Sequence, residues 1–101
     1  MPKTKIEEFT DDEIQLADLA KALSHPARIK IIKILASLDV CVCGEIVDKL
    51  PLAQATVSQH LKELKHAGLI NGHAKKPFIK YCINKENWST AKKLFNELFN
   101  E

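Results

Sequence analysis

Several features of other protein classes are missing from this 101-residue sequence. No apolar run approaches the roughly 18 residues that are needed to cross a bilayer. The polar start, Met1-Pro2-Lys3-Thr4-Lys5, is not followed by the apolar stretch of a secretory signal. The three cysteines are few and odd in number, which argues against a disulfide framework. We therefore expect a cytoplasmic protein without a membrane partner.

The sequence also lacks the patterns that would indicate catalysis. It has no Ser/His/Asp arrangement, no glycine-rich phosphate loop among its three glycines, and no carboxylate pair in a credible pocket. We therefore expect no enzymatic activity and no permanently bound cofactor. The apolar fraction of 46% is that of a folded protein, and the length allows one modest core. A single domain over residues 1–101 is predicted, with an ordered part from about residue 11 to 99.

Two helices are predicted in the first part of the chain. Thr10 and Glu13 form a Thr-x-x-Glu capping box, which indicates a helix that begins near Asp11. The turn at residues 24–26 ends this helix and starts a second over residues 26–37, because proline is tolerated in a first turn and not inside a helix. We expect the second helix to bury three apolar side chains, Ile29, Ile32 and Leu35.

Residues 41–73 contain a helix-turn-helix pattern. Residues 43–50 indicate a short third helix, residues 51–53 a turn, and a fourth helix opens at Gln54 with its apolar stripe at Val57, Leu61 and Leu64. Short polar side chains at the start of such a helix suit a reader of the DNA major groove. The candidate DNA-binding residues on this helix are those outside the stripe, which we expect to be exposed: Gln54, Thr56, Ser58, Gln59, His60 and Lys62.

A β-hairpin is predicted directly after the reading helix. Gly68 supplies a helix stop, and the strand-like runs at residues 69–74 and 78–83 flank a turn at residues 75–77. Residues 51–83 carry five lysines and one acidic residue, a balance that suits a phosphate-facing surface, although a solvated lysine-rich face would look the same. The candidate phosphate contacts are Lys75, Lys76 and Lys80.

A last helix is predicted from Asn84, a favourable N-cap. The element order is α-α-α-α-β-β-α, a mostly α winged helix-turn-helix with a small β wing and an extra helix at each end. The first and last helices carry more apolar surface than the small core can cover, so we expect a homodimer formed by these two helices. The apolar residues of the last helix are Trp88, Ala91, Leu94, Phe95, Leu98 and Phe99.

Three motifs in this order resemble the ArsR/SmtB-type metalloregulatory repressors. Residues 23–32 (LSHPARIKII) resemble the second-helix signature of that family, residues 41–46 (CVCGEI) its metal-binding box, and residues 54–70 its recognition helix and the turn that follows. The resemblance covers about residues 11–99. It implies a homodimeric winged-helix repressor that binds double-stranded operator DNA and releases it when a thiophilic metal or metalloid occupies a sensor site.

The resemblance also implies that Cys41 and Cys43 are metal ligands. The third cysteine of the arsenic-type box is replaced here by Ile46, and the residues of the zinc-type site are missing from the last helix. Cys82 is the remaining thiol and a candidate third ligand, if residues 40–43 form a strand beside residues 81–83. Arsenite or antimonite is then the favoured effector, with cadmium, lead and zinc as alternatives. Core packing of Cys82 is the competing interpretation.

Three functional hypotheses remain open from the sequence. The first is a repressor that a thiophilic ion releases from DNA. The second is a regulator of the same fold that responds to thiol oxidation, or that binds DNA constitutively, since thiols at the start of a helix can have a lowered pKa. The third is a helical interaction module that does not bind DNA. Salt-dependent binding to a palindromic duplex separates the first two hypotheses from the third.

Overall fold

The computed structural model of the protein describes residues 8–38, 41–43 and 50–101. Helices α1 (Asp11–Ala22) and α2 (Pro26–Leu38) are followed by the short strand β1 (Val42–Cys43) and by helix α4 (Gln54–His66). Strands β2 (Ile70–Lys75) and β3 (Phe78–Ile83) form the hairpin, and helix α5 (Lys85–Phe99) ends the chain. The predicted third helix falls mostly on residues 44–49, which lie outside the described residues.

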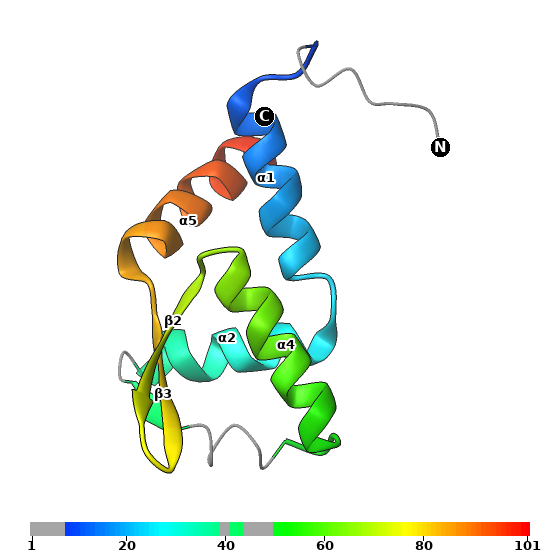
Figure 1. Cartoon of the computed structure of the whole chain (residues 1–101). Coiled ribbons are helices and arrows are strands. Elements are labelled where there is room, and N and C mark those ends of the chain that lie inside the picture. The colour runs from blue at the N-terminus through cyan, green and yellow to red at the C-terminus, as the bar shows by residue number, and fades with distance from the viewer. Residues whose placement is uncertain (1–7, 39–40, 44–49) are drawn as a thin grey trace.

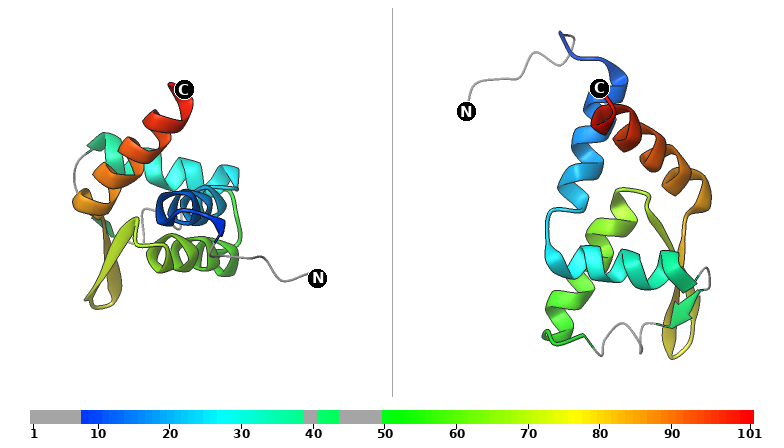
Figure 2. Two further views of the ribbon diagram at one scale, coloured as in Figure 1. Left: turned by 90° about the horizontal axis from the view of Figure 1, so that it is seen from above. Right: turned by 180° about the vertical axis from the view of Figure 1, so that it is seen from behind.

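The helices divide the molecule into two ends. Helices α2 and α4 cross and pack together, and β3 contacts α2 on the side of the hairpin. Helices α1 and α5 extend away from this body and approach each other toward the C-terminus, and the molecule measures 46 × 32 × 23 Å (Figure 1). The hairpin points to the opposite end, away from the C-terminus (Figure 2). This architecture is the predicted winged helix-turn-helix. No helix among the described residues is long and apolar enough to cross a membrane.

Local side-chain caps explain where the outer helices begin. Thr10 N donates to Glu13 Oε1 at 2.8 Å and Glu13 N donates to Thr10 Oγ1 at 3.1 Å, which completes the predicted capping box of α1. Asn84 caps α5 by accepting a hydrogen bond from Asn87 N at 3.1 Å. Gly68, with φ of 82°, follows α4 in the left-handed conformation that favours glycine.

The sheet has three antiparallel strands in the order β1-β3-β2. Val42 lies opposite Tyr81, and Cys43 lies opposite Lys80. On the other side of β3, Ile70 pairs with Ile83 and Lys75 with Phe78. The predicted extended segment before the helix-turn-helix is therefore present as β1, and it lies beside the second strand of the wing.

The core differs from the prediction on helix α2. Ile29 is 40% exposed, whereas Ile31, which the sequence analysis left out, is fully buried. Helix α2 packs through Ala27, Ile31 and Leu35, a face with a spacing of four residues, and the predicted Ile32 and Leu35 are buried with it. The central cluster is completed from the other elements by Leu19, Ala22, Val42, Leu50, Val57, Leu61, Leu64, Leu69, Ile70, Ala91 and Leu94.

Candidate nucleic-acid interface

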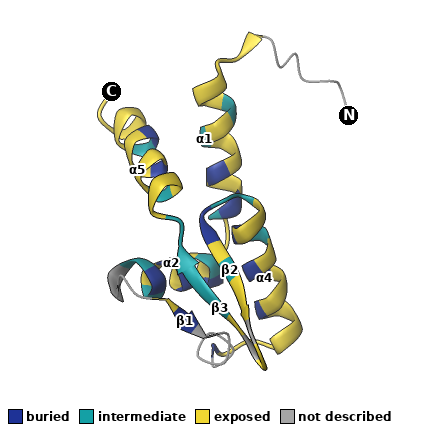
Figure 3. Cartoon of the chain, turned by 60° about the vertical axis from the view of Figure 1, so that its left-hand side comes forward, coloured by how far each residue is buried: buried dark blue, intermediate teal, exposed yellow. Residues whose placement is uncertain are grey.

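Helix α4 presents a polar face to solvent and an apolar face to the core. Val57, Leu61 and Leu64 are buried, as their spacing predicts, and they fix which side of the helix is turned outward. The exposed side is visible along the length of the helix in Figure 3. It carries five of the predicted reading residues, Gln54, Thr56, Ser58, Gln59 and Lys62. In this structure Gln59 Nε2 donates a hydrogen bond to Glu63 Oε1 at 3.0 Å.

His60 does not share this exposed face, and its predicted exposure is wrong. Its side chain is only 6% exposed and points into the protein. Arg28 Nε donates a hydrogen bond to His60 Nδ1 at 3.0 Å, and the ring of His25 lies 4.2 Å from the His60 ring between centroids. His60 stands three residues after Val57 and four before Leu64, which is a core position of the helix. Its polar side chain is accommodated inside because α2 supplies a partner.

The environment of His60 favours its neutral form. Burial lowers the pKa of His60 below the ordinary value of 6.5, and the neighbouring charges of His25 and Arg28 lower the pKa further. His60 Nε2 is buried and has no hydrogen-bond partner among the described residues. The side chain is therefore a neutral link between α2 and α4.

The wing places further basic side chains at the same end of the molecule as the start of α4. The hairpin tip and the first turn of α4 both face away from the ends of α1 and α5 (Figures 1 and 2). Lys76, at the tip, is exposed, and Lys80, on β3, is half-buried. The side chain of Lys75 lies outside the described set. This end therefore combines a polar helix start with a basic hairpin tip, a combination that suits contact with a DNA groove and its phosphates.

A contact that no local sequence pattern predicts joins α5 to the base of the wing. Asn87 Nδ2 donates to the backbone oxygen of Gly68 at 2.9 Å, and Asn84 N donates to the Leu69 oxygen at 2.9 Å. The glycine and the two asparagines were visible in the sequence, but only as local signals for a helix end and a helix start. Their pairing depends on the fold.

Two of the three cysteines meet at the sheet. Cys41 and Cys82 form a disulfide whose Cα atoms are 4.3 Å apart. The antiparallel register that sets Val42 against Tyr81 continues to this pair, which brings Cys41 directly opposite Cys82. Cys41 is exposed and Cys82 is half-buried. The predicted approach of these two sulfurs is present, but as a disulfide, which the odd number of cysteines did not predict. The side chain of Cys43 lies outside the described set, so the three-sulfur site stays a prediction.

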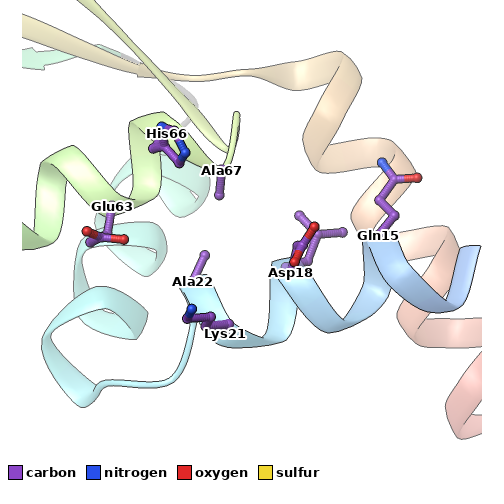
Figure 4. A pocket seen from close by; sticks show the side chains of 8 residues that line it. Gln15, Asp18, Lys21, Ala22, Glu63, His66 and Ala67 are labelled. Atoms are coloured by element: carbon purple, nitrogen blue, oxygen red, sulfur yellow. The ribbon is translucent and has the colours of Figure 1, made fainter. Parts of the chain in front are cut away.

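A polar pocket of about 410 Å³ separates α1 from the second half of α4 (Figure 4). Asp18 and Lys21 line it from α1, and Glu63 and His66 line it from α4. Despite these side chains, the described residues contain no group of three or more His, Cys, Asp or Glu side chains that could hold a metal ion. The pocket therefore adds no metal ligands to the cysteines that the sequence indicates.

Comparisons with known proteins agree with this architecture. Residues 25–72 match the model of the bacterial regulatory proteins of the arsR family. The chain is 36% identical over 83 residues to an HTH-type transcriptional regulator of Methanocaldococcus jannaschii, which covers 81% of this chain and 92% of that protein. It is 38% identical to the transcriptional repressor SdpR of Bacillus subtilis over 63% of this chain and 70% of that protein.

Solved structures extend the similarity over nearly the whole chain. HlyU from Vibrio cholerae superposes with a TM-score of 0.70 at 26% identity, covering 92% of this chain and all of that protein. A structure of the reduced form of HlyU is also known. HlyU therefore shares the overall fold described above. The protein belongs to the arsR family of transcriptional regulators, which are DNA-binding proteins and not enzymes.

Proposed function

We propose that the protein is a homodimeric repressor that binds operator DNA through α4 and the wing, and that chemistry at Cys41 and Cys82 sets its DNA affinity. The observation that carries the proposal is the disulfide between these two residues. It links the segment before the helix-turn-helix to β3, the second strand of the wing. A change at this sulfur pair therefore acts directly on the part of the protein that would face the phosphates.

The DNA-binding surface in this proposal has two parts. The exposed residues Thr56, Ser58 and Gln59 would read base edges in the major groove, because short polar side chains at a helix start reach the base edges. Gln54 and Lys62 flank them on the same helix. Lys76 and Lys80, with Lys75 at the start of the tip, would contact phosphates and supply affinity that is independent of sequence.

The dimer in this proposal uses the outer helices. Phe99 is 74% exposed and Leu98 is 48% exposed at the end of α5, and Phe9 is 48% exposed just before α1. Large apolar side chains gathered at one end of a small protein are typical of a surface that another chain covers. A two-fold dimer would also pair two reading helices, as a palindromic operator requires. The relative SdpR is a transcriptional repressor, which favours the same role for this protein.

Thiol oxidation is the input that this geometry favours. A hydroperoxide would oxidise the exposed Cys41 thiolate to a sulfenic acid, and the Cys82 thiol would then displace water to form the disulfide. Two electrons pass from the two sulfurs to the peroxide in this sequence. Since the dithiol is the resting state in a reducing compartment, the repressor would bind DNA when it is reduced and release it when it is oxidised. A structure of reduced HlyU is known for this relative, which suits this input.

A thiophilic ion is the second candidate input, and the position of Cys43 favours it. Cys43 stands two residues after Cys41 in the extended segment, opposite Lys80, which is two residues before Cys82 in β3. Three reduced thiolates at this end of the sheet would suit arsenite or antimonite, which are soft acceptors of sulfur ligands. Cadmium, lead and zinc are the alternative ions. In this case the effector would bind the reduced protein, and the disulfide would block it.

One experiment tests the function and separates the two inputs. The reduced protein is used to select a duplex from a randomised DNA library, and binding of that duplex is measured by fluorescence anisotropy during titration with hydrogen peroxide or arsenite. We expect peroxide to release the DNA from the wild type and from Cys43→Ser, but not from Cys82→Ser. A response to arsenite that Cys43→Ser removes would favour the ion as the input. Failure to select any duplex, or release from all cysteine variants alike, would contradict the proposal.

A further inference from the structure

From its position in α2, Arg28 contacts two other helices. Its Nε atom donates to His60 Nδ1 of α4 at 3.0 Å. Its Nη1 atom donates to the backbone oxygens of Lys21 and Ala22, each at 3.4 Å, at the end of α1. The last carbonyl groups of a helix lack intrahelical partners and accept hydrogen bonds from cationic side chains, and Lys21 O also accepts one from Ser24 Oγ at 2.6 Å. The guanidinium group therefore ties the reading helix to α2 and to the last turn of α1.

The hydrogen bond between Arg28 and His60 fixes the protonation state of the histidine. An arginine Nε atom always carries hydrogen, so His60 Nδ1 must accept and cannot carry a proton in this arrangement. The single proton of the neutral ring then resides on Nε2, which is buried and without a partner among the described residues. His25 Nδ1 likewise accepts a hydrogen bond, from Ala27 N at 3.0 Å.

A second proton on His60 is incompatible with this contact. The second proton would place an Nδ1–H group of His60 against the Nε–H group of Arg28. The positive charge of the imidazolium would then lie beside that of the guanidinium group. The groups that face His60 do not compensate this charge: Arg28 approaches from α2, and the His25 ring lies against it from the residue before α2. From α1 the contact with Arg28 is made by carbonyl oxygens. On α4 itself the nearest carboxylate, Glu63, is bonded to Gln59 on the exposed side.

We propose that Arg28 and His60 form a proton-sensitive latch that positions the reading helix, so that protonation of His60 releases α4 from α2 and weakens operator binding. The proposal rests on the DNA-binding role of α4 proposed above. His60 acts here through the helix, as a positioning residue, and the proton is the ligand that the latch responds to. Because neutral His60 is already favoured by its surroundings, the response falls below pH 6.5 and not at neutrality.

The direction of this effect distinguishes the latch from ordinary surface titration. His66 and His73 are exposed, on α4 and on the wing strand β2. Protonation of such residues adds positive charge to the protein surface, which favours binding to phosphates. The latch predicts the opposite sign, a loss of affinity in acid. A fall in affinity therefore cannot come from the surface histidines.

The test compares DNA affinity at about pH 7.5 and about pH 5.5 for three proteins, at constant ionic strength and with reductant present. His60→Asn retains an acceptor oxygen for Arg28 but does not titrate, and His66→Asn removes an exposed histidine from the same helix. We expect the affinity of the wild type and of His66→Asn to fall several-fold, by at most about tenfold, which is the limit at pH 5.5 for one group whose pKa lies below 6.5. We expect the affinity of His60→Asn to stay within about twofold.

Nitrogen-15 NMR of the histidine rings supplies a measurement that does not depend on the variants. It should show His60 as the Nε2–H tautomer at neutral pH, with a pKa below 6.5. The latch is overturned if His60 carries its proton on Nδ1, if wild-type affinity is unchanged or rises in acid, or if His60→Asn falls as the wild type does. A protein that binds no duplex at pH 7.5 would overturn the proposed function together with the latch's effect on DNA, whereas normal binding at pH 7.5 without loss in acid would overturn the latch alone.

Discussion

Asn87, in the first turn of α5, donates a hydrogen bond from its side chain to the backbone oxygen of Gly68 at 2.9 Å. Gly68 ends the reading helix and begins the approach to the wing, so this contact joins the proposed dimer helix to the base of the DNA-binding region. The two residues are 19 positions apart in the sequence. The side chain of Asn87 also lies close against Gly68, so that replacing this glycine would destabilise the protein.

Replacing Gly68 by alanine should destabilise the protein by about 1–2 kcal/mol, the cost of a left-handed conformation for a residue with a Cβ atom. The added Cβ would also lie 2.9 Å from Asn87 Nδ2, which forces the amide away from its acceptor. Urea unfolding measures the change. Asn87→Ala should cost about 1 kcal/mol through the lost hydrogen bond, whereas Ser89→Ala, at an exposed position of the same helix, serves as the control. Equal stability of Gly68→Ala and wild type would contradict the strained conformation.

The local parts of the fold were predictable from the sequence because the residues that determine them are neighbours. The capping box at Thr10 and Glu13 and the N-cap at Asn84 set the starts of α1 and α5 as expected. Helix α2 shows the limit of this reasoning. Its apolar residues at 29, 31, 32, 34 and 35 do not define one face, so the side that is buried depends on what packs against it.

The functional residues also fall into two groups, those that follow from neighbouring residues and those that depend on distant partners. His60 was assigned to the exposed face because of its polar side chain, although its spacing from Val57 and Leu64 is that of a core residue. The burial of His60 depends on Arg28, which is 32 residues away, and the residues around His60 do not predict this partner. The meeting of Cys41 with Cys82 was a geometric hypothesis that required one particular strand register, and the register of β1 with β3 supplies it.

The two kinds of DNA contact should respond differently to mutation. Gln59→Ala should relax base discrimination and cost about 1–3 kcal/mol on the selected duplex, because its amide can leave Glu63 to bond a base edge. Lys76→Ala should weaken binding to all sequences alike and flatten the dependence on salt. Anisotropy titrations on the selected duplex and on a shuffled duplex, over a range of salt, measure both effects. Lys92→Ala, on the exposed face of α5, is the control, and equal behaviour of all three variants would remove α4 and the wing as the interface.

The end of α5 should hold the dimer together. Phe99 is 74% exposed and its ring stacks on Phe95 with centroids 5.9 Å apart, so the pair presents a broad apolar surface. Phe99→Asp would place a charge in the proposed interface, and burial of an unpaired charge is strongly unfavourable. We expect sedimentation to show a monomer at concentrations where the wild type is a dimer, together with a loss of operator affinity. Ser89→Asp should remain dimeric, and a dimeric Phe99→Asp would exclude this end of α5 from the interface.

Reduction of the disulfide should lower the stability of the protein without unfolding it. The bond closes a loop across a sequence separation of 41 residues, and its removal restores freedom to the unfolded chain. Chain-entropy arguments give an upper value of about 3–4 kcal/mol for a loop of this size. Urea unfolding of the oxidised wild type, with and without dithiothreitol, measures the difference, and Cys82→Ser should match the reduced protein under both conditions. Cys43→Ser should remain sensitive to dithiothreitol, because Cys41 and Cys82 still pair in it. If dithiothreitol leaves the wild type unchanged, the two sulfurs are not joined in solution, and the ion becomes the favoured input at this site.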